Sequence, residues 1–144
     1  MPKILIPFDG SASSVRALRY VASPAAAMKP SEFLLLNVQH PVPMADLLLD
    51  GRPSQMYRLE APMRQAGEKM LSTAGEVLDK ANIAYKSRVE FGEPAQTIVD
   101  IAGTHHCELI VMGTRGMGRI KSLLLGSVAT KVLHLARIPV LLIR

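Results

Sequence analysis

Short apolar runs alternate along this chain with segments in which apolar residues return every three or four positions. The first pattern is typical of buried strands, and the second is typical of amphipathic helices that cover a sheet. Strands are therefore expected at Ile4–Phe8, Phe33–Val38, Leu109–Met112 and Val140–Ile143. Strands that alternate with helices in this way form βαβ units, so the pattern predicts an α/β fold with a parallel sheet.

The first helix is expected to begin at Ser11, because a serine side chain can accept a hydrogen bond from a backbone N–H of the first turn. It should end or kink near Ala22, since Pro24 cannot continue the helical hydrogen bonds. Residues 39–55 contain three prolines and no clean period. They are expected to form a long surface loop, and loops of this length are often functional.

Three further helices are expected later in the chain. One is marked by apolar residues between Met63 and Ala81, with Pro62 in its first turn, where a proline is tolerated. The next begins at Glu93-Pro94, and the last spans Ser127–Leu135. Each of them precedes an expected strand, as βαβ units require.

Two of the expected strands have the character of sheet edges. In residues 84–91 apolar and charged side chains alternate, which fits an edge strand with one face in water. Val140–Ile143 is apolar on both faces and ends the chain, and an unprotected apolar ladder at a sheet edge invites pairing. We therefore expect a two-fold dimer through Val140–Ile143. The alternative is that helices of the same chain cover both faces of this strand.

Composition narrows the class of protein. The 144 residues suit one domain, expected to span residues 1–144, and 49% hydrophobic with 4% aromatic residues suits an aliphatic core. No apolar run approaches the ~20 residues of a membrane span, and the apolar stretch near the N-terminus is too short for a signal peptide. With one cysteine, Cys107, a cytoplasmic protein is expected. The net charge of +5 comes from scattered residues, so no nucleic-acid partner is expected.

The stretch from residue 108 to 127 carries the most chemical information. Leu109–Met112 runs into Gly113, a loop rich in Gly, Arg and Lys follows, and Gly126-Ser127 opens a helix. Glycines let the backbone approach an anion, while free N–H groups and the helix dipole favour its negative charge. The arrangement therefore predicts a phosphate site, with a nucleotide as the ligand.

Two common phosphate loops do not fit this stretch. A Walker A loop needs Lys and then Ser or Thr after its second glycine, but Arg119 follows Gly118. The dinucleotide fingerprint would begin at Gly116, but Lys121 stands where its third glycine belongs. What remains is a different spacing, Gly113-x2-Gly116-x9-Gly126-Ser127.

This spacing closely resembles the motif of the universal stress protein family, Gly-x2-Gly-x9-Gly-Ser/Thr. The opening residues 4–11, the fourth strand with Gly113 and the ending residues 138–143 also resemble the family, so the resemblance covers the whole chain. It implies a Rossmann-like three-layer α/β sandwich with five parallel strands in the order 3-2-1-4-5. Strands one and four are then neighbours, and the crevice at their carboxyl ends is where such sheets bind ligands.

The resemblance also implies a set of binding residues. In ATP-binding members the residue matching Asp9 lies near adenosine and the metal, backbone at the position of Val38 meets adenine, and the glycine loop with Ser127 and Val128 holds ribose and phosphates. The expected nucleotide site comprises Pro7, Asp9, Val38, Met112, Gly113, Arg115, Gly116, Gly126, Ser127 and Val128. The expected ligands are ATP and Mg²⁺, or another divalent cation, near Asp9. Alternatively, Asp9 accepts hydrogen bonds from ribose or from its own turn.

Several candidate residues have a second interpretation. Ser127 is placed to cap the last helix, to bind phosphate, or both. Arg115 either neutralises a phosphate or stays in solvent, and Arg119 and Lys121 are expected in solvent. The run His105-His106-Cys107 has metal-binding side chains, but adjacent helical residues point about 100° apart. A surface helix end followed by a buried Cys107 is expected there instead.

The function expected from the sequence is that of a dimeric regulatory module that binds ATP or a related adenine nucleotide in the stress response. The nucleotide would stabilise one arrangement of the loops at 39–55 and 114–125, which a regulatory protein partner would read. Two alternatives stay open. One is slow ATP hydrolysis that starts from Asp9 and a metal, although no general base and no Walker-type lysine are evident. The other is a dimerising scaffold that has lost the nucleotide.

Overall fold

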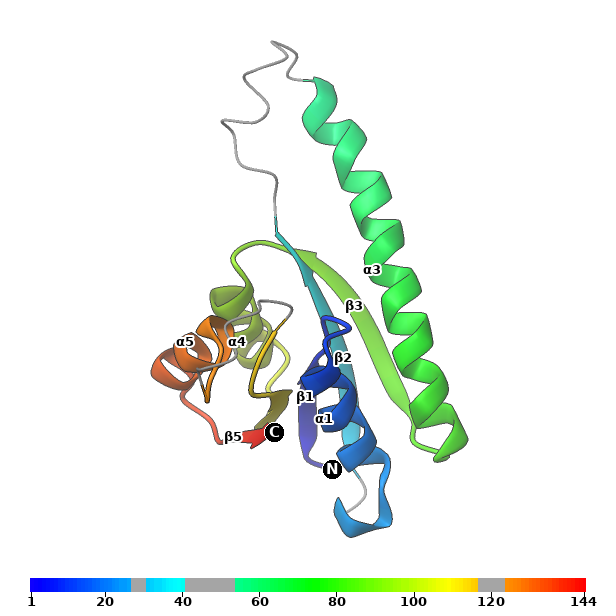
Figure 1. Ribbon diagram of the computed structural model, residues 1–144, viewed down its shortest axis with the longest axis vertical. Helices are drawn as coiled ribbons and strands as arrows, with labels where there is room; N and C mark the ends of the chain where they lie inside the picture. Colours follow the sequence, from blue (N-terminus) through cyan, green and yellow to red (C-terminus); the bar gives the residue numbers. More distant parts are fainter. Residues whose placement is uncertain (27–30, 41–53, 117–123) are drawn as a thin grey trace.

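The computed structural model describes residues 1–26, 31–40, 54–116 and 124–144. Most of the expected loop at 39–55 lies outside the described residues, as do Arg119 and Lys121. Within the described chain, five strands form one sheet and helices lie on both of its faces (Figure 1). No helix in this part of the chain is long and apolar enough to cross a membrane.

The sheet has the strand order β3-β2-β1-β4-β5. Its strands are β1 (Lys3–Pro7), β2 (Glu32–Gln39), β3 (Tyr85–Phe91), β4 (Leu109–Gly113) and β5 (Val140–Ile143). Every neighbouring pair is parallel, so all the carboxyl ends lie at one edge of the sheet. The expected fold class and the order 3-2-1-4-5 are confirmed, with β1 and β4 side by side.

Helices on the two faces of the sheet make the molecule a three-layer sandwich (Figure 1). On one face lie α1 (Ala12–Ala22), which a short 3-10 turn η1 (Pro24–Ala26) follows, and α3 (Ser54–Lys80). On the other face lie α4 (Pro94–Thr104) and α5 (Ser127–Leu135). The first turns of α1, α4 and α5 lie at the carboxyl edge of the sheet.

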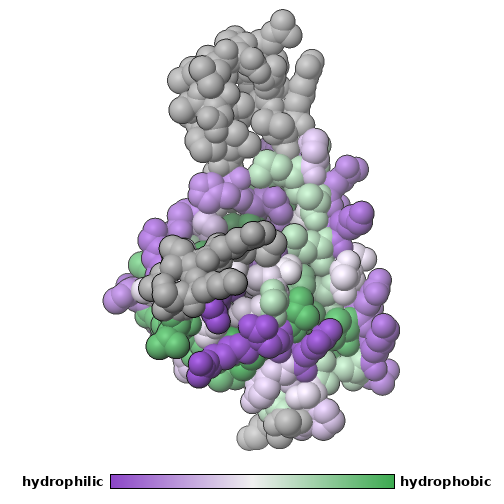
Figure 2. Space-filling view, viewed as in Figure 1, coloured by the Kyte–Doolittle hydropathy of each residue, from purple (hydrophilic) through white to green (hydrophobic). Residues whose placement is uncertain are grey.

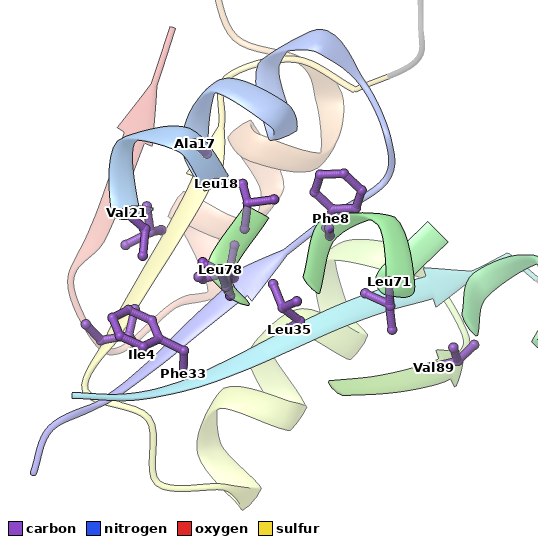
Figure 3. Close-up of a cluster of buried hydrophobic side chains, with 13 residues drawn as sticks. Ile4, Phe8, Ala17, Leu18, Val21, Phe33, Leu35, Leu71, Leu78 and Val89 are labelled. Carbon is purple, nitrogen blue, oxygen red and sulfur yellow. The ribbon is translucent and has the colours of Figure 1, made fainter. Parts of the chain in front are cut away.

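The core is aliphatic, and the sheet divides it into two clusters of buried side chains. Successive residues of a strand point to opposite faces, so β1 supplies Ile6 to one cluster and Leu5 to the other. Figure 3 shows the first cluster, in which Leu18 of α1 and Leu78 of α3 face Leu35 of β2. These three side chains are almost completely buried. The packing fixes the rotation of α1 and therefore the position of its first turn at the open edge.

The helix ends largely follow the expectations from the sequence. The Ser11 Oγ accepts a hydrogen bond from Ser14 N–H at 3.1 Å, and α1 stops at Ala22. Glu93 caps α4, because its carboxylate accepts a hydrogen bond from a first-turn N–H at 2.8 Å. The last helix has the predicted bounds, Ser127–Leu135.

The expected position of Pro62 in the first turn of its helix is wrong. α3 begins at Ser54, so Pro62 lies inside the helix, where it removes one helical hydrogen bond. The helix extends upstream because residues 54–61 are mostly good helix formers, which the lack of an apolar period concealed. Pro62 is exposed, so water can satisfy the carbonyl group that loses its partner.

The two expected edge strands lie at the two ends of the sheet. Lys86 and Arg88 of β3 are exposed, as an edge strand with one wet face requires. All four residues of β5 are half-buried in the single chain. Figure 2 shows hydrophilic side chains along the outer side of α3 and hydrophobic side chains at the surface beside β5. Within one chain, β5 therefore keeps apolar surface in contact with water.

Candidate functional site

A cleft opens at the carboxyl edge of the sheet, where β1 and β4 end side by side. Its walls come from the turns after these strands, the end of β2 and the first turns of α1, α4 and α5. The residues that line it are Pro7, Phe8, Asp9, Ser11, Ser14, Leu36, Val38, Pro94, Ile98, Met112, Gly113, Arg115, Gly116, Val128 and Ala129. All predicted site residues except Gly126 and Ser127 are among them.

One side of the cleft is apolar. It is formed by Leu36 and Val38 of β2, Ile98 of α4, Met112 of β4 and Val128 of α5. The lining residues enclose about 120 Å³, which is less than the roughly 300–1,000 Å³ of typical ligand pockets. The described residues can therefore surround one flat group, such as a base, while the rest of a larger ligand would lie over the rim.

Asp9 lies on the turn between β1 and α1. Gly10 follows it with a φ of +78°, a left-handed conformation that glycine adopts without strain. The Asp9 Oδ1 accepts a hydrogen bond from Ser11 N–H at 2.9 Å. The Asp9 Oδ2 faces the loop after β4, since a Cβ on Gly116 would lie 3.1 Å from it. One oxygen of this exposed carboxylate thus holds the turn, and the other is directed at the loop.

Gly113 ends β4 where the first turn of α1 packs against it. A Cβ at this position would overlap the Ser13 Oγ and would lie 2.6 Å from the Ser13 carbonyl carbon. Only glycine permits so close an approach of the two backbones. Packing against α1 therefore explains the first glycine of the motif, in addition to its place in the cleft.

Two serines at the start of α1 hold the loop that follows β4. The Ser11 Oγ donates a hydrogen bond to the Arg115 carbonyl at 3.2 Å, and the Ser13 Oγ accepts one from Arg115 N–H at 3.3 Å. From the other side, Thr114 N–H donates to the Ile143 carbonyl at 3.0 Å. Sequence reasoning gave Ser11 only a capping role and missed Ser13. The sequence did contain a signal for this contact. Strands one and four were expected to be neighbours, and neighbouring parallel strands bring the turns that follow them together.

The start of α5 lies against the same loop. Gly126 is the N-cap residue, its N–H donates to the Thr114 carbonyl at 2.6 Å, and no side chain caps the helix. Ser127 is the exposed first residue of α5, so the interpretation of Ser127 as the cap is wrong. A side chain at the cap position would crowd the loop, because a Cβ on Gly126 would lie 3.2 Å from the Arg115 Cα. Among the described residues, no side chain caps the first-turn N–H groups of α5.

The charges around the cleft favour an anion that binds together with a cation. Among the described lining residues, Asp9 is the single carboxylate and Arg115 the single permanent cation. α5 has no acidic residue in its first turn, so its dipole places partial positive charge at the rim. The described residues hold no group of three or more His, Cys, Asp or Glu side chains suited to a metal ion. A cation beside Asp9 would therefore need oxygens from the ligand and from water.

The run His105-His106-Cys107 lies away from the cleft. His105 is the C-cap residue of α4, and its Nε2 lies 3.1 Å from the Arg88 guanidinium. Desolvation, followed by the charges of Arg88 and Lys3, lowers the pKa of His105. Cys107 is buried, and this burial raises the pKa of its thiol. The expected helix end with a buried cysteine is confirmed.

A second hollow, of about 680 Å³, opens at the opposite edge of the sheet beside the start of β3. Its lining residues include Lys3, Lys86, Arg88 and His105, but no glycine and no first turn of a helix. Open parallel sheets bind ligands at the carboxyl ends of their strands. The cleft at β1 and β4 is therefore the candidate site.

Comparison with known proteins agrees with this fold. The sequence model of the universal stress protein family matches residues 1–144. The chain belongs to the universal stress protein family. One relative, a universal stress protein of Thermus aquaticus, is 34% identical over 142 residues, which cover 98% of this chain and 97% of that protein.

Solved structures of universal stress proteins and their relatives share the same architecture. Protein MJ0577 of Methanocaldococcus jannaschii matches with a TM-score of 0.83 and 26% identity, over 99% of this chain and 94% of that one. The universal stress protein of Archaeoglobus fulgidus was solved in complex with dAMP. It matches with a TM-score of 0.66 and 25% identity, over 100% of this chain and 98% of that one.

Proposed function

We propose that this universal stress protein binds an adenine nucleotide, with ATP as the preferred candidate, in the cleft at the carboxyl ends of β1 and β4. The observation that carries the proposal is the meeting of the Gly113–Gly116 loop with the uncapped start of α5 beside an apolar hollow. Helix N-termini with free N–H groups bind phosphate. The complex of the Archaeoglobus fulgidus relative with dAMP supports adenine as the base.

The two halves of the cleft suggest how the nucleotide lies. The apolar side at Val38 and Met112 suits a base, which would be largely enclosed in the volume available there. The ribose would then lie near Asp9, and the phosphates would reach Gly116 and the N–H groups of Ser127 and Val128. Arg115 is the nearest permanent cation among the described lining residues for phosphate charge.

A divalent cation, Mg²⁺ for example, fits the chemistry of this site only together with the nucleotide. Asp9 offers one carboxylate oxygen, Oδ2, that no described residue occupies by a hydrogen bond. Mg²⁺ is commonly held by one or two carboxylates together with phosphates and water. The bound cation would neutralise phosphate charge, and Asp9 would orient it toward the loop.

We further propose that the protein acts as a homodimeric regulatory module. β5 lies at the end of the sheet, where its outer edge is available to a second copy. Pairing two β5 strands around a two-fold axis would cover their half-buried apolar residues. The loops expected to respond to nucleotide lie largely outside the described residues, so their reading by a partner protein stays a prediction, as does the cytoplasmic location.

Calorimetric titration of the nucleotide-free protein with Mg-ATP tests the binding site. Gly126→Val should weaken binding at least about tenfold, because its branched side chain pushes against the Arg115 Cα and displaces the loop. The matched control is Gly103→Val, at an exposed position of α4 where an added Cβ meets nothing within 4 Å. Absence of binding to the folded wild type would leave the dimerising scaffold as the better account.

A further inference from the structure

The last residues of β5 contact the loop after β4 (the nucleotide loop, described for residues 114–116) and also form the outer edge of the sheet. The Ile143 carbonyl accepts two hydrogen bonds, from Thr114 N–H at 3.0 Å and from the Ser13 Oγ at 3.3 Å. The Ser13 Oγ in turn accepts the Arg115 N–H at 3.3 Å. One hydroxyl, using its donor and one acceptor position, thus connects the end of β5 to the loop.

This connection is buried and closely packed. Ser13 is 3% exposed and Thr114 is 4% exposed, so water cannot easily replace these bonds. Gly113 pairs with Ile143 in the sheet register, and it touches Ser13 so closely that a Cβ would not fit. A shift at the end of β5 must therefore move either Ser13 or the loop.

The other side of β5 is the open edge of the sheet. The carbonyls of Pro139 and Ile143 face β4, because they accept hydrogen bonds from Ile110 and Thr114. The N–H and C=O groups of alternate residues point to opposite sides of a strand. The backbone groups of Val140 and Leu142 therefore point outward, where a second copy of the chain would pair. The same four-residue strand thus contacts the loop through one side and would pair with a second copy through the other.

We infer that Ser13 and Ile143 couple the two events, so that nucleotide binding and pairing with a second copy of this chain strengthen each other. The inference rests on the proposed function, since it needs both the nucleotide and the dimer. β5 is a short strand that is hydrogen-bonded to a neighbour on one side only, and a β5 that left the sheet would lose both the Ile143 acceptor and the pairing edge. Nucleotide and partner each favour the ordered strand, so each should raise the affinity of the other by the same factor.

Analytical ultracentrifugation with and without saturating Mg-ATP tests this coupling. For the wild type we expect the dimer dissociation constant to fall about tenfold with ATP, within the range of known couplings. Ser13→Ala should lower this factor, because the hydroxyl that joins Ile143 to Arg115 is gone and only the Thr114 N–H bond still connects Ile143 to the loop. A serine that only stabilised the fold would weaken the dimer equally with and without ATP, and the factor would remain.

Ser23→Ala is the matched control at the other end of α1. It also removes a hydroxyl that donates to a backbone carbonyl, that of Tyr20 at 2.7 Å, but it touches neither the loop nor β5. It should keep the wild-type factor. If the wild type binds ATP and dimerises with the same dissociation constant in both conditions, the coupling is wrong and the proposed function stands. If ATP does not bind, or no dimer forms, the proposed function and the coupling are both wrong.

Discussion

At the scale of single residues, two glycines and two serines hold the described residues of the loop after β4 in place. Gly113 lets α1 approach the end of β4, and Gly126 lets α5 approach the Arg115 backbone. Ser11 and Ser13 then hold Arg115 from both sides of its peptide group. Packing within the protein thus requires Gly113 and favours Gly126, and the shape of the candidate cleft follows from this packing.

Gly113→Ala should destabilise the fold by about 1–3 kcal/mol, the usual cost of forcing an extra methyl group into a packed interior. The added Cβ would overlap the Ser13 Oγ. Gly103→Ala, in the exposed last turn of α4, should be neutral or stabilise by about 0.5–1 kcal/mol, since it only improves helix propensity. Urea unfolding of both variants measures the difference, and equal stability of the two would contradict the packing argument.

Asp9→Asn should weaken ATP binding about tenfold in the presence of Mg²⁺, which corresponds to one contact with a charged group. In EDTA the variant should bind ATP as the wild type does, because the amide oxygen can still accept the Ser11 N–H. Asp100→Asn, on the surface of α4, is the control and should change neither titration. An equal loss with and without Mg²⁺ would mean that Asp9 contacts the nucleotide or its own turn and not the cation.

At the scale of elements, helix N-termini in this fold are used in two different ways. α1 and α4 have side-chain caps, Ser11 and Glu93, each of which accepts a hydrogen bond from a first-turn N–H. α5 has only Gly126 at its cap position and no acidic residue in its first turn. Of these three helices, α5 is the one without a side-chain cap among the described residues, and its start lies against the glycine loop, as an anion site requires.

Glu93→Ala should cost about 1 kcal/mol at neutral pH through loss of the α4 cap. The hydrogen bond from Gln96 N–H holds the pKa of Glu93 below its ordinary value near 4.5. A carboxylate with a lowered pKa stabilises the fold above its unfolded pKa, and that contribution is lost as the pH falls through the folded pKa. The difference in unfolding free energy between wild type and variant should therefore be constant near neutrality and shrink below about pH 4.5. Glu76→Ala, on the exposed face of α3, should show no such difference.

Most elements could be predicted from the sequence because aliphatic runs and cap residues are local signals. Val140–Ile143 and Ser127–Leu135 have the predicted bounds for this reason. The extension of α3 upstream of Pro62 could not be predicted, since a proline is disfavoured there and no apolar period compensates. The contact of Ser13 with Arg115 joins residues far apart in sequence, and only the packed structure brings them together.

At the scale of the whole molecule, the sheet presents three different edges to its surroundings. Its carboxyl edge holds the cleft. One of its two outer strands is β3, which exposes charged side chains to solvent, and the other is β5, whose side chains are apolar. Charged side chains on an edge oppose pairing with other chains, while an apolar ladder favours it. The asymmetry between β3 and β5 therefore selects β5 as the edge for a second copy.

Leu142→Pro tests that selection. The Leu142 N–H points away from β4, so proline should leave the fold nearly intact while it removes a donor and adds bulk at the outer edge. We expect a monomer by light scattering, with far-UV circular dichroism like that of the wild type. Leu141→Pro is the contrasting variant, since its N–H faces β4 and its loss should destabilise the fold itself. An unchanged dimer in Leu142→Pro would contradict pairing through β5.

The location of the nucleotide is the central claim, and an NMR titration of the ¹⁵N-labelled protein with Mg-ATP tests it most directly. The account predicts that the amide signals of Asp9, Gly116, Ser127 and Val128 shift with one common dissociation constant. Amides beside the hollow at the opposite edge, such as those of Lys86 and Arg88, should stay in place. Shifts confined to that opposite edge, or no shifts at saturating ATP, would contradict the proposed site.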